Sequence, residues 1–186
     1  MTAEQVEQVK RRHLLLAYAN AMQPGVFSLS SWDLVGALPL PAESVSERLH
    51  DQDYRWINRG AVDLLGKHPG ATQSAYGLPR AKALYGSLPE QLHDPGSFAS
   101  QLKKLLEARR RIRLPLGKLA AVPEVGNTAA CVVVFQLPEK DAYAITALTF
   151  GRESVRETVS LAWIAPCGGP PLAGRKLLDA VSGEVE

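Results

Sequence analysis

The first strong pattern of apolar positions is helical and runs over residues 2–22. In its first half Val6 and Val9 lie on one side among polar residues, whereas residues 14–19 (LLLAYA) are apolar all round. Thr2 and Gln5 have the spacing of a capping box, and a Pro-Gly pair ends the pattern at 24–25. A helix that is apolar on every side must be covered on every side. We therefore expect its second half to pack against several elements.

A short apolar run follows this helix. Residues 26–30 (VFSLS) have the length and composition of a strand, and a helix, a tight turn and a short strand are the parts of an α/β unit. Parallel strands need neighbours on both edges and cover on both faces, which the adjoining sequence does not supply. The pattern predicts a strand whose neighbours lie in polypeptide upstream of these residues.

Residues 31–93 are punctuated by Pro and Gly, and we expect a long loop with short helical pieces at 44–50 and 58–65. The run at 38–41 (LPLP) excludes helix there. Long loops in compact domains are functional or disordered. Aromatic residues spread through this region favour order: Trp32, Tyr54, Trp56, Tyr76 and Tyr85.

The clearest helix is predicted to open at Asp94, as N-cap, with Pro95 in its first turn. Its apolar stripe comprises Phe98, Leu102, Leu105, Leu106 and Ile112. The basic residues between them are Lys103, Lys104, Arg109, Arg110 and Arg111. Interleaved aromatics, which single-strand nucleic-acid binding uses, are missing here, so a solvated helix face explains the basic residues better than an RNA or phosphate surface.

From Leu119 onward the pattern becomes β. Residues 129–137, 142–150 and 154–164 are rich in Val, Thr and Ile, with turns at 138–141 and 151–153. We expect these runs to form an antiparallel meander, so the predicted fold class is α+β.

The composition narrows the classes of protein. The chain has 186 residues, 46% hydrophobic and 22% charged, with 21 Lys and Arg against 19 Asp and Glu. This near-neutral balance argues against a nucleic-acid partner, and the apolar run at 14–19 is too short to cross a membrane. The two cysteines, Cys131 and Cys167, do not build a disulfide framework, which favours a reducing cytoplasm. The cysteines and histidines also have no metal-ligand spacing, and we expect no metal and no cofactor; the histidines are His13, His50, His68 and His93.

A family resemblance is carried by residues 24–36 (PGVFSLSSWDLVG). This segment resembles the last barrel strand of glycoside hydrolase family 13, the α-amylase family, whose trehalose synthases carry a Pro-Gly-x-Pro-x-x-Tyr-Tyr-Gly-Asp-Glu-Ile-Gly-like segment. Residues 14–17 are similar to the preceding barrel helix, 94–109 to the last barrel helix, and 144–151 (AITALTFG) to a strand of the family's C-terminal β domain. The chain looks most like the trehalose synthase, or maltose α-D-glucosyltransferase, group.

The resemblance implies a domain plan. Residues 1–117 would be the last β/α unit of a (β/α)8 barrel with its long loop and last helix. Residues 118–186 would be an antiparallel, β-sandwich-like C-terminal domain that these residues leave incomplete. The implied function is that of a C-terminal fragment of an enzyme that converts maltose to trehalose by retaining glucosyl transfer.

The sequence also departs from the family pattern. Trp32 replaces Gly and Leu34 replaces Glu in the common Gly-Asp-Glu, so only Asp33 remains. The nucleophilic Asp, the acid Glu and the second Asp of the family lie on earlier strands, so the fragment has no catalytic residue and is not catalytic by itself. The His50-Asp51 pair does not match the Asn-His-Asp motif of the family and is interpreted as a solvated helix end.

Two groups are candidate substrate-binding residues. In one interpretation Trp32 is a stacking platform for a sugar and Asp33 accepts hydrogen bonds from its hydroxyls, because active-site loops follow the strand ends of a barrel. In the other, Trp32 is a core filler and Asp33 a cap for the following turn. The second group comprises Arg55, Trp56, Asn58 and Arg59. Residues of these types can bind sugar hydroxyls or a carboxylate elsewhere in the protein. The alternative is that they only pack the loop.

The expected partners follow from the same resemblance. They are an α-glucoside such as maltose or trehalose in the complete enzyme, and the remainder of the barrel or a second copy over the apolar surface of 14–19 and 26–29. The alternative is a stand-alone, non-catalytic module that binds carbohydrate or protein through its β half.

Overall fold

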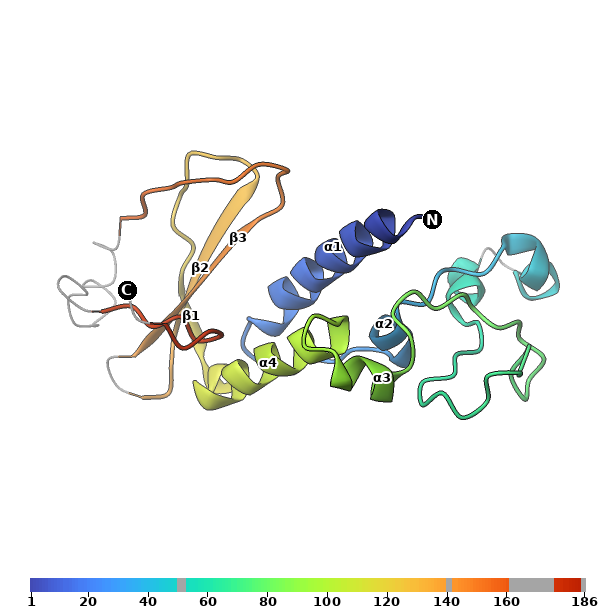
Figure 1. Cartoon of the computed structure of the whole chain (residues 1–186). Helices are drawn as coiled ribbons and strands as arrows, with labels where there is room; N and C mark the ends of the chain where they lie inside the picture. The colour runs from blue at the N-terminus through green and yellow to red at the C-terminus, as the bar shows by residue number, and fades with distance from the viewer. Residues whose placement is uncertain (50–52, 140–141, 161–175, 185–186) are drawn as a thin grey trace. The chain divides into compact units, whose positions relative to one another are not determined.

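The structure is a computed structural model that describes residues 1–49, 53–139, 142–160 and 176–184. Its contacts divide the chain into two compact units. Unit 1 consists of Met1–Leu14 and Ser28–Leu102, and unit 2 of Leu15–Phe27 and Lys103–Glu186. Two of the three divisions, at 14/15 and 102/103, fall inside the helices labelled α1 (Ala3–Ala21) and α4 (Phe98–Arg111) in Figure 1, so each of these helices contributes one part to each unit. The expected domain limits of 1–117 and 118–186 stay a prediction.

The described residues contain helices and one antiparallel sheet, which is an α+β composition. The α-helices are α1 (Ala3–Ala21), α2 (Ser31–Val35), α3 (Leu88–His93) and α4 (Phe98–Arg111). Short 3₁₀ helices are η1 (Ala42–Arg48), η3 (Tyr54–Asn58) and η4 (Leu114–Leu116). The strands are β1 (Lys118–Ala121), β2 (Ala130–Gln136) and β3 (Tyr143–Thr149). The barrel itself remains an expectation.

Helix α1 begins where its sequence predicts. The Thr2 backbone N–H donates to Gln5 Oε1 at 2.8 Å, and the Gln5 N–H donates to Thr2 Oγ1 at 3.2 Å, which completes the capping box. The expectation of full cover over residues 14–19 is wrong in this structure. Ala17 is buried, but the Leu16 side chain is 55% exposed, because α1 is packed on only part of its circumference.

The long loop region folds around a small core in unit 1. Leu40, Val45 and Ala81 are buried, and Trp56 and Ile57 pack against them. The predicted piece at 44–50 corresponds to η1, whereas the helix predicted at 58–65 is wrong. Ala61 instead forms an isolated bridge with Arg80, so the backbone there pairs across the loop rather than within a helix turn.

The boundary before α4 also differs from the expectation. Asp94 is not the N-cap of α4; it follows α3, which has its own capping box between Ser87 and Glu90, and its carboxylate accepts from the Gly96 N–H at 2.8 Å. Helix α4 starts at Phe98, where Ser97 Oγ accepts from the Ser100 N–H at 3.2 Å. The predicted apolar stripe is confirmed by the burial of Phe98, Leu102 and Leu105, its first three members, whereas Leu106 and Ile112 are half-buried.

The sheet of unit 2 has the order β1-β2-β3 with both pairs antiparallel. The strands expected at 129–137 and 142–150 are confirmed as β2 and β3, with Val134 opposite Ile145. The strand expected at 154–164 is wrong for residues 154–160, which form no strand; residues 161–164 lie outside the described part. Glu157 explains this difference, because its carboxylate accepts from the Gly126 and Asn127 N–H groups at 3.1 and 2.9 Å and so holds the segment by a side chain. The third strand of the sheet is β1, which precedes β2 in the chain and pairs with it, in place of the expected strand after β3.

Residues 26–30 form no strand in the described part of the chain. A strand exists only with a ladder partner, and none of the described residues pairs with this run. The strand prediction is therefore wrong for this chain as it stands.

Candidate functional site

Asp33 lies in the first turn of α2 and takes part in its cap. Asp33 Oδ2 accepts from the backbone N–H and the hydroxyl of Ser30, at 3.1 and 2.8 Å. In return, the Asp33 N–H donates to Ser30 Oγ at 3.2 Å. Asp33 Oδ1 lies 3.5 Å from His13 Nε2. Both carboxylate oxygens therefore have partners within unit 1, as in the capping alternative.

Three rings gather beside Asp33 in unit 1. The His13 ring stacks on Phe98, with centroids 4.4 Å apart, and Tyr85 lies 5.2 Å from Phe98. His13 Nδ1 lies 3.1 Å from the Tyr85 hydroxyl. With the ring proton on Nε2, facing Asp33, Nδ1 accepts the hydrogen bond from the phenol. Sequence reasoning missed this cluster, because its members come from three separate segments.

The phenol of Tyr85 is held in its protonated form. Burial, followed by the negative charges of Asp33 and Glu7, raises the pKa of Tyr85 to about 12. A phenol with such a pKa donates a hydrogen bond at neutral pH and is not a nucleophile there. The cluster of His13, Tyr85 and Phe98 therefore joins α1 to α4 and the loop before α3 rather than presenting a reactive oxygen.

The second candidate group lies on and beside η3. Arg55 binds Asp53 with two hydrogen bonds, Nε to Oδ1 at 2.7 Å and Nη2 to Oδ2 at 2.8 Å. The hydrogen bonds from the Arg55 side chain lower the pKa of Asp53 to about 2. The guanidinium of Arg55 is thus engaged by a carboxylate two positions away, while the Asn58 side chain is exposed.

The ring of Trp56 is contacted by two arginines, one before it and one after it in the sequence. The guanidinium carbons of Arg59 and Arg48 lie 4.8 and 5.4 Å from its ring centroid, and the ring packs against the core of Leu40, Val45 and Ala81. These cation–π contacts use the surface that a sugar would stack on. The contacts of Trp56 agree with the loop-packing alternative. Sugar binding by Arg55, Trp56, Asn58 and Arg59 stays a prediction.

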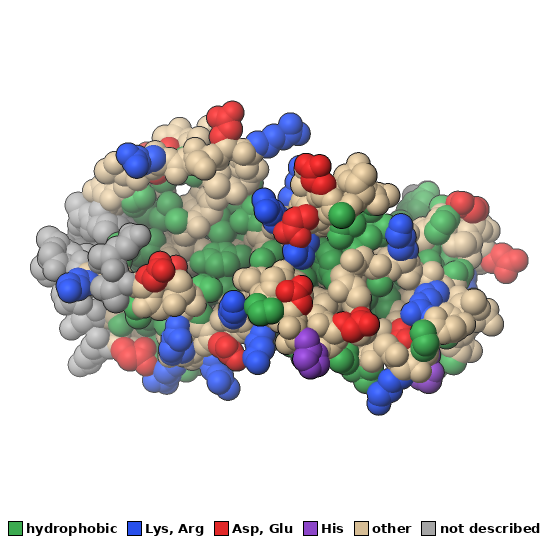
Figure 2. Space-filling model, in the orientation of Figure 1, with side chains coloured by type: hydrophobic (Ala, Val, Ile, Leu, Met, Phe, Trp, Pro, Cys, Tyr) green, Lys and Arg blue, Asp and Glu red, His purple; other side chains and the backbone are tan. Residues whose placement is uncertain are grey.

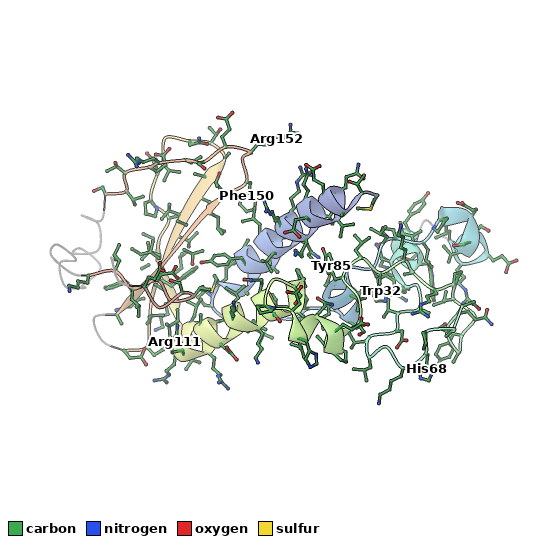
Figure 3. All side chains as sticks on the ribbon, in the orientation of Figure 1. Trp32, His68, Tyr85, Arg111, Phe150 and Arg152 are labelled. Carbon is green, nitrogen blue, oxygen red and sulfur yellow. The ribbon has the colours of Figure 1, made fainter. Side chains whose placement is uncertain are left out.

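Among the described residues, the structure shows no contact between the first candidate group, on α2, and the second, on and beside η3. No hydrogen bond, ion pair or ring contact there joins Trp32 or Asp33 to the residues of η3. Trp32 lies on α2 and is partly buried (Figure 3). The His50-Asp51 pair lies outside the described residues.

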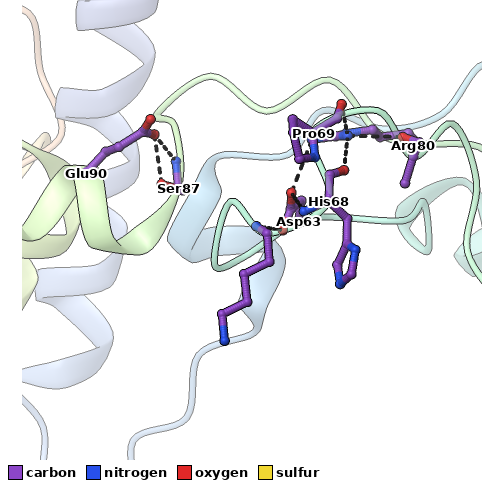
Figure 4. A network of polar contacts seen from close by, with 8 residues as sticks. Asp63, His68, Pro69, Arg80, Ser87 and Glu90 are labelled. Atoms are coloured by element: carbon purple, nitrogen blue, oxygen red, sulfur yellow. Dashed lines mark hydrogen bonds and ion pairs between the residues drawn. The ribbon is translucent and has the colours of Figure 1, made fainter.

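A polar network in the loop of unit 1 is structural (Figure 4). Asp63 accepts from the Lys67 and His68 N–H groups at 3.0 and 2.7 Å, and Arg80 Nη1 donates to three carbonyl oxygens, those of His68, Pro69 and Ala71. Burial acts to raise the pKa of Asp63, but the two hydrogen bonds and the charge of Arg80 outweigh it, so the pKa is lowered. The side chains of Asp63 and Arg80 thus bind backbone groups of residues 67–71 and stabilise this turn.

Unit 2 contains an open groove of about 520 Å³. We call it the Val26 groove; its lining residues are Gly25, Val26, Phe27, Leu106, Arg109, Arg110, Arg113, Pro115 and Leu116. Arg109 was expected on a solvated face, yet it is only 8% exposed, which corrects that part of the expectation. Elsewhere on α4 the expectation holds: Lys103, Lys104, Arg110 and Arg111 are exposed, and Figure 2 shows blue side chains gathered over this helix.

Comparison with protein-family models, with curated proteins and with solved structures finds no match to this chain. None of the described helices is both long and apolar enough to cross a membrane. Within the described ranges, no three or more His, Cys, Asp or Glu side chains come together as metal ligands would.

Proposed function

We propose that this chain is the C-terminal portion of a family 13 enzyme that converts maltose to trehalose by retaining glucosyl transfer, and that it is not catalytic by itself. The order of its elements supports the proposal: a helix, an apolar run with no partner, a capped turn with Trp32 and Asp33, a long ordered loop, a helix and an antiparallel sheet. Trp32 would offer its ring to a glucose unit. We assign the complete enzyme to the cytoplasm.

The observation that carries the proposal is the unpaired run at 26–29. The backbone groups of these residues make no hydrogen bond to any described residue, and the Val26 side chain is 99% exposed. A parallel strand that lacks its neighbours would leave its backbone groups unpaired and its apolar side chains exposed in this way. Neighbouring strands supplied by further polypeptide would pair this run and cover Val26.

The chemistry supports a non-catalytic role for the chain alone. Retaining transfer needs two carboxyl groups about 5 Å apart on either side of the glycosidic bond. Asp33, the one acidic residue that the family pattern retains here, has its oxygens engaged by Ser30 and His13. The Asp33 side chain is 41% exposed, and a carboxylate has about four acceptor sites, so it would also have room to accept a hydrogen bond from a substrate hydroxyl.

The test compares the chain alone with the chain joined to the polypeptide encoded directly upstream. We expect no conversion between maltose and trehalose by the purified chain, followed by nuclear magnetic resonance of the sugars, and conversion by the joined protein. The matched control is the joined protein with its upstream nucleophilic carboxylate changed to the amide. Turnover by the chain alone that a carboxylate substitution within it abolishes would overturn the proposal.

The second candidate function is a stand-alone module that binds carbohydrate or protein through its β half. It is favoured by exposed apolar side chains in unit 2 at Leu119, Val122 and Phe150, the last labelled in Figure 3. An upstream reading frame without barrel strands and carboxylates would favour this module over the enzyme fragment.

A further inference from the structure

The Val26 groove combines an apolar floor with a basic rim. Val26 and Leu116 are 99% and 62% exposed, and Phe27, Leu106 and Pro115 lie beside them. Exposed apolar groups of this kind, gathered in a groove, are typical of a surface that another molecule covers.

The backbone of the groove has hydrogen-bonding groups to offer. The Gly25 N–H donates to the Pro115 carbonyl at 2.9 Å and the Gly25 carbonyl accepts from Arg109 at 2.6 Å, so this residue is fixed within unit 2. The N–H and C=O groups of Val26 and Phe27, directly after it, make no hydrogen bond to any described residue. An extended chain laid against Val26 and Phe27 would satisfy these groups with backbone hydrogen bonds like those of β-strand addition.

The charged residues that line the groove are of one sign. Its lining holds three arginines and no Asp or Glu. Arg109 is saturated by carbonyl oxygens, and Arg113 donates to Glu139 at 3.0 Å. Arg110 is exposed and has no ion-pair partner in the described part of the chain. The unpaired charge at the rim is therefore positive, and it favours an occupant that carries a carboxylate.

We propose that the Val26 groove binds an extended polypeptide segment with alternating apolar side chains and an acidic residue. Its backbone pairs with Val26 and Phe27, its apolar side chains lie over Leu106 and Leu116, and its carboxylate meets Arg110. A second copy of this chain fits less well, because two copies of the same rim would bring Arg110 and Arg113 against equal charges. The inference rests on the proposed function only in taking this segment to belong to the same enzyme.

The test uses peptides and does not depend on catalysis. The probe is a capped octapeptide of alternating valine and threonine with one glutamate, and it is titrated into the full chain while backbone amide resonances are followed. Two matched peptides replace the glutamate by lysine or carry N-methyl groups at alternate amides. The variants are Arg110→Glu and, as a control on the same helix but outside the groove, Lys104→Glu, each checked for an unchanged circular dichroism spectrum.

We expect the glutamate peptide to shift resonances of residues 25–27 and 113–116. The affinity should be about five- to tenfold lower for the lysine peptide, and also for the glutamate peptide with the Arg110→Glu variant, because each change replaces an attraction at the rim by a repulsion, a difference of about 1 kcal/mol. The affinity should change little with Lys104→Glu. The lysine peptide should regain affinity for Arg110→Glu. The N-methylated peptide should not bind.

Several results would overturn the inference. These are no binding of the glutamate peptide, equal binding of the lysine peptide, equal binding of the N-methylated peptide, or sedimentation of the free chain as a dimer that Val26→Ser returns to a monomer. Failure of the joined protein to convert maltose, with peptide binding intact, would overturn the proposed enzyme and leave the groove as a binding surface.

Discussion

Arg109 Nε donates to the carbonyl oxygen of Ala21, the last residue of α1, at 2.5 Å. Its Nη2 donates to the carbonyl oxygens of Gln23 and Gly25 at 3.0 and 2.6 Å. The last carbonyls of a helix have no partner within the helix, and a cation there also interacts well with the helix dipole. One side chain of α4 thus caps α1 and fixes the turn that leads to the Val26 groove.

Replacing Arg109 by Met should destabilise unit 2 strongly. Three carbonyl oxygens would lose their donors, and leaving them without partners should lower the free energy of unfolding by about 3 kcal/mol. Arg109→Lys should fall between wild type and Arg109→Met, because an ammonium cannot reproduce the geometry of the fork. Urea unfolding followed by circular dichroism measures both.

The control for this prediction is Arg110→Met on the same helix. Its side chain is exposed, so the free energy of unfolding should change by less than about 0.5 kcal/mol. Equal losses for the two variants would contradict a capping role for Arg109.

The position of Arg109 shows what the sequence pattern could and could not predict. The spacing of Phe98, Leu102 and Leu105 continues to residue 109, so periodicity alone turns this side chain inward. The residue type argued for solvent, because buried arginines need partners. Those partners are carbonyl groups more than 80 positions earlier in the chain, which no local pattern reveals.

Elements defined by neighbouring residues were predictable, and those defined by distant pairing were not. The cap of α1 depends on Thr2 and Gln5 and follows from the sequence. The segment at 154–160 has the composition of a strand, but the carboxylate of Glu157 joins it to a turn 30 residues earlier. The cluster of His13 and Tyr85 likewise depends on a contact across 72 positions.

Gln91→Leu should destabilise unit 1. The Gln91 side chain is buried; its Nε2 donates to the Leu34 carbonyl at 2.7 Å and its Oε1 accepts from the Ala99 N–H at 3.0 Å. Leucine has a similar size but leaves both backbone groups unpaired, so the free energy of unfolding should fall by about 2–4 kcal/mol. The control Gln101→Leu removes an exposed hydrogen bond and should cost less than about 1 kcal/mol. Similar losses in urea unfolding would contradict a connecting role for Gln91.

Gly36→Ala should be more damaging than an alanine at another glycine with positive φ. Gly36 has φ +60°, and a Cβ there would lie 2.6 Å from a ring carbon of Tyr85. Gly77 has φ +72° but no atom within 4 Å of such a Cβ, so Gly77→Ala isolates the backbone strain of about 1–2 kcal/mol. We expect Gly36→Ala to add about 1–3 kcal/mol for the overlap. Equal melting temperatures of the two variants would show that the Tyr85 ring moves aside without cost.

The stability of unit 1 should fall as the pH rises above about 10. The pKa of Tyr85 is about 12 in the fold, against 10.0 for an unperturbed tyrosine, since burial and the charges of Asp33 and Glu7 disfavour the phenolate. Between these values the unfolded chain releases the proton while the folded chain keeps it, so the free energy of unfolding decreases with pH. The stabilisation is complete below about pH 10 and is lost as the pH passes 12.

Tyr85→Phe separates this effect from the other groups that titrate at high pH. At pH 8 the variant should be about 1 kcal/mol less stable, because His13 loses the phenol hydrogen bond. From pH 10 to 12 its stability should decline less than that of the wild type, so the difference between the two shrinks or reverses. Tyr76→Phe, which removes a phenol from an 84% exposed side chain, should follow the wild type throughout. Parallel curves for Tyr85→Phe and the wild type in urea unfolding at each pH would show that Tyr85 ionises equally in both states and is not held protonated by the fold.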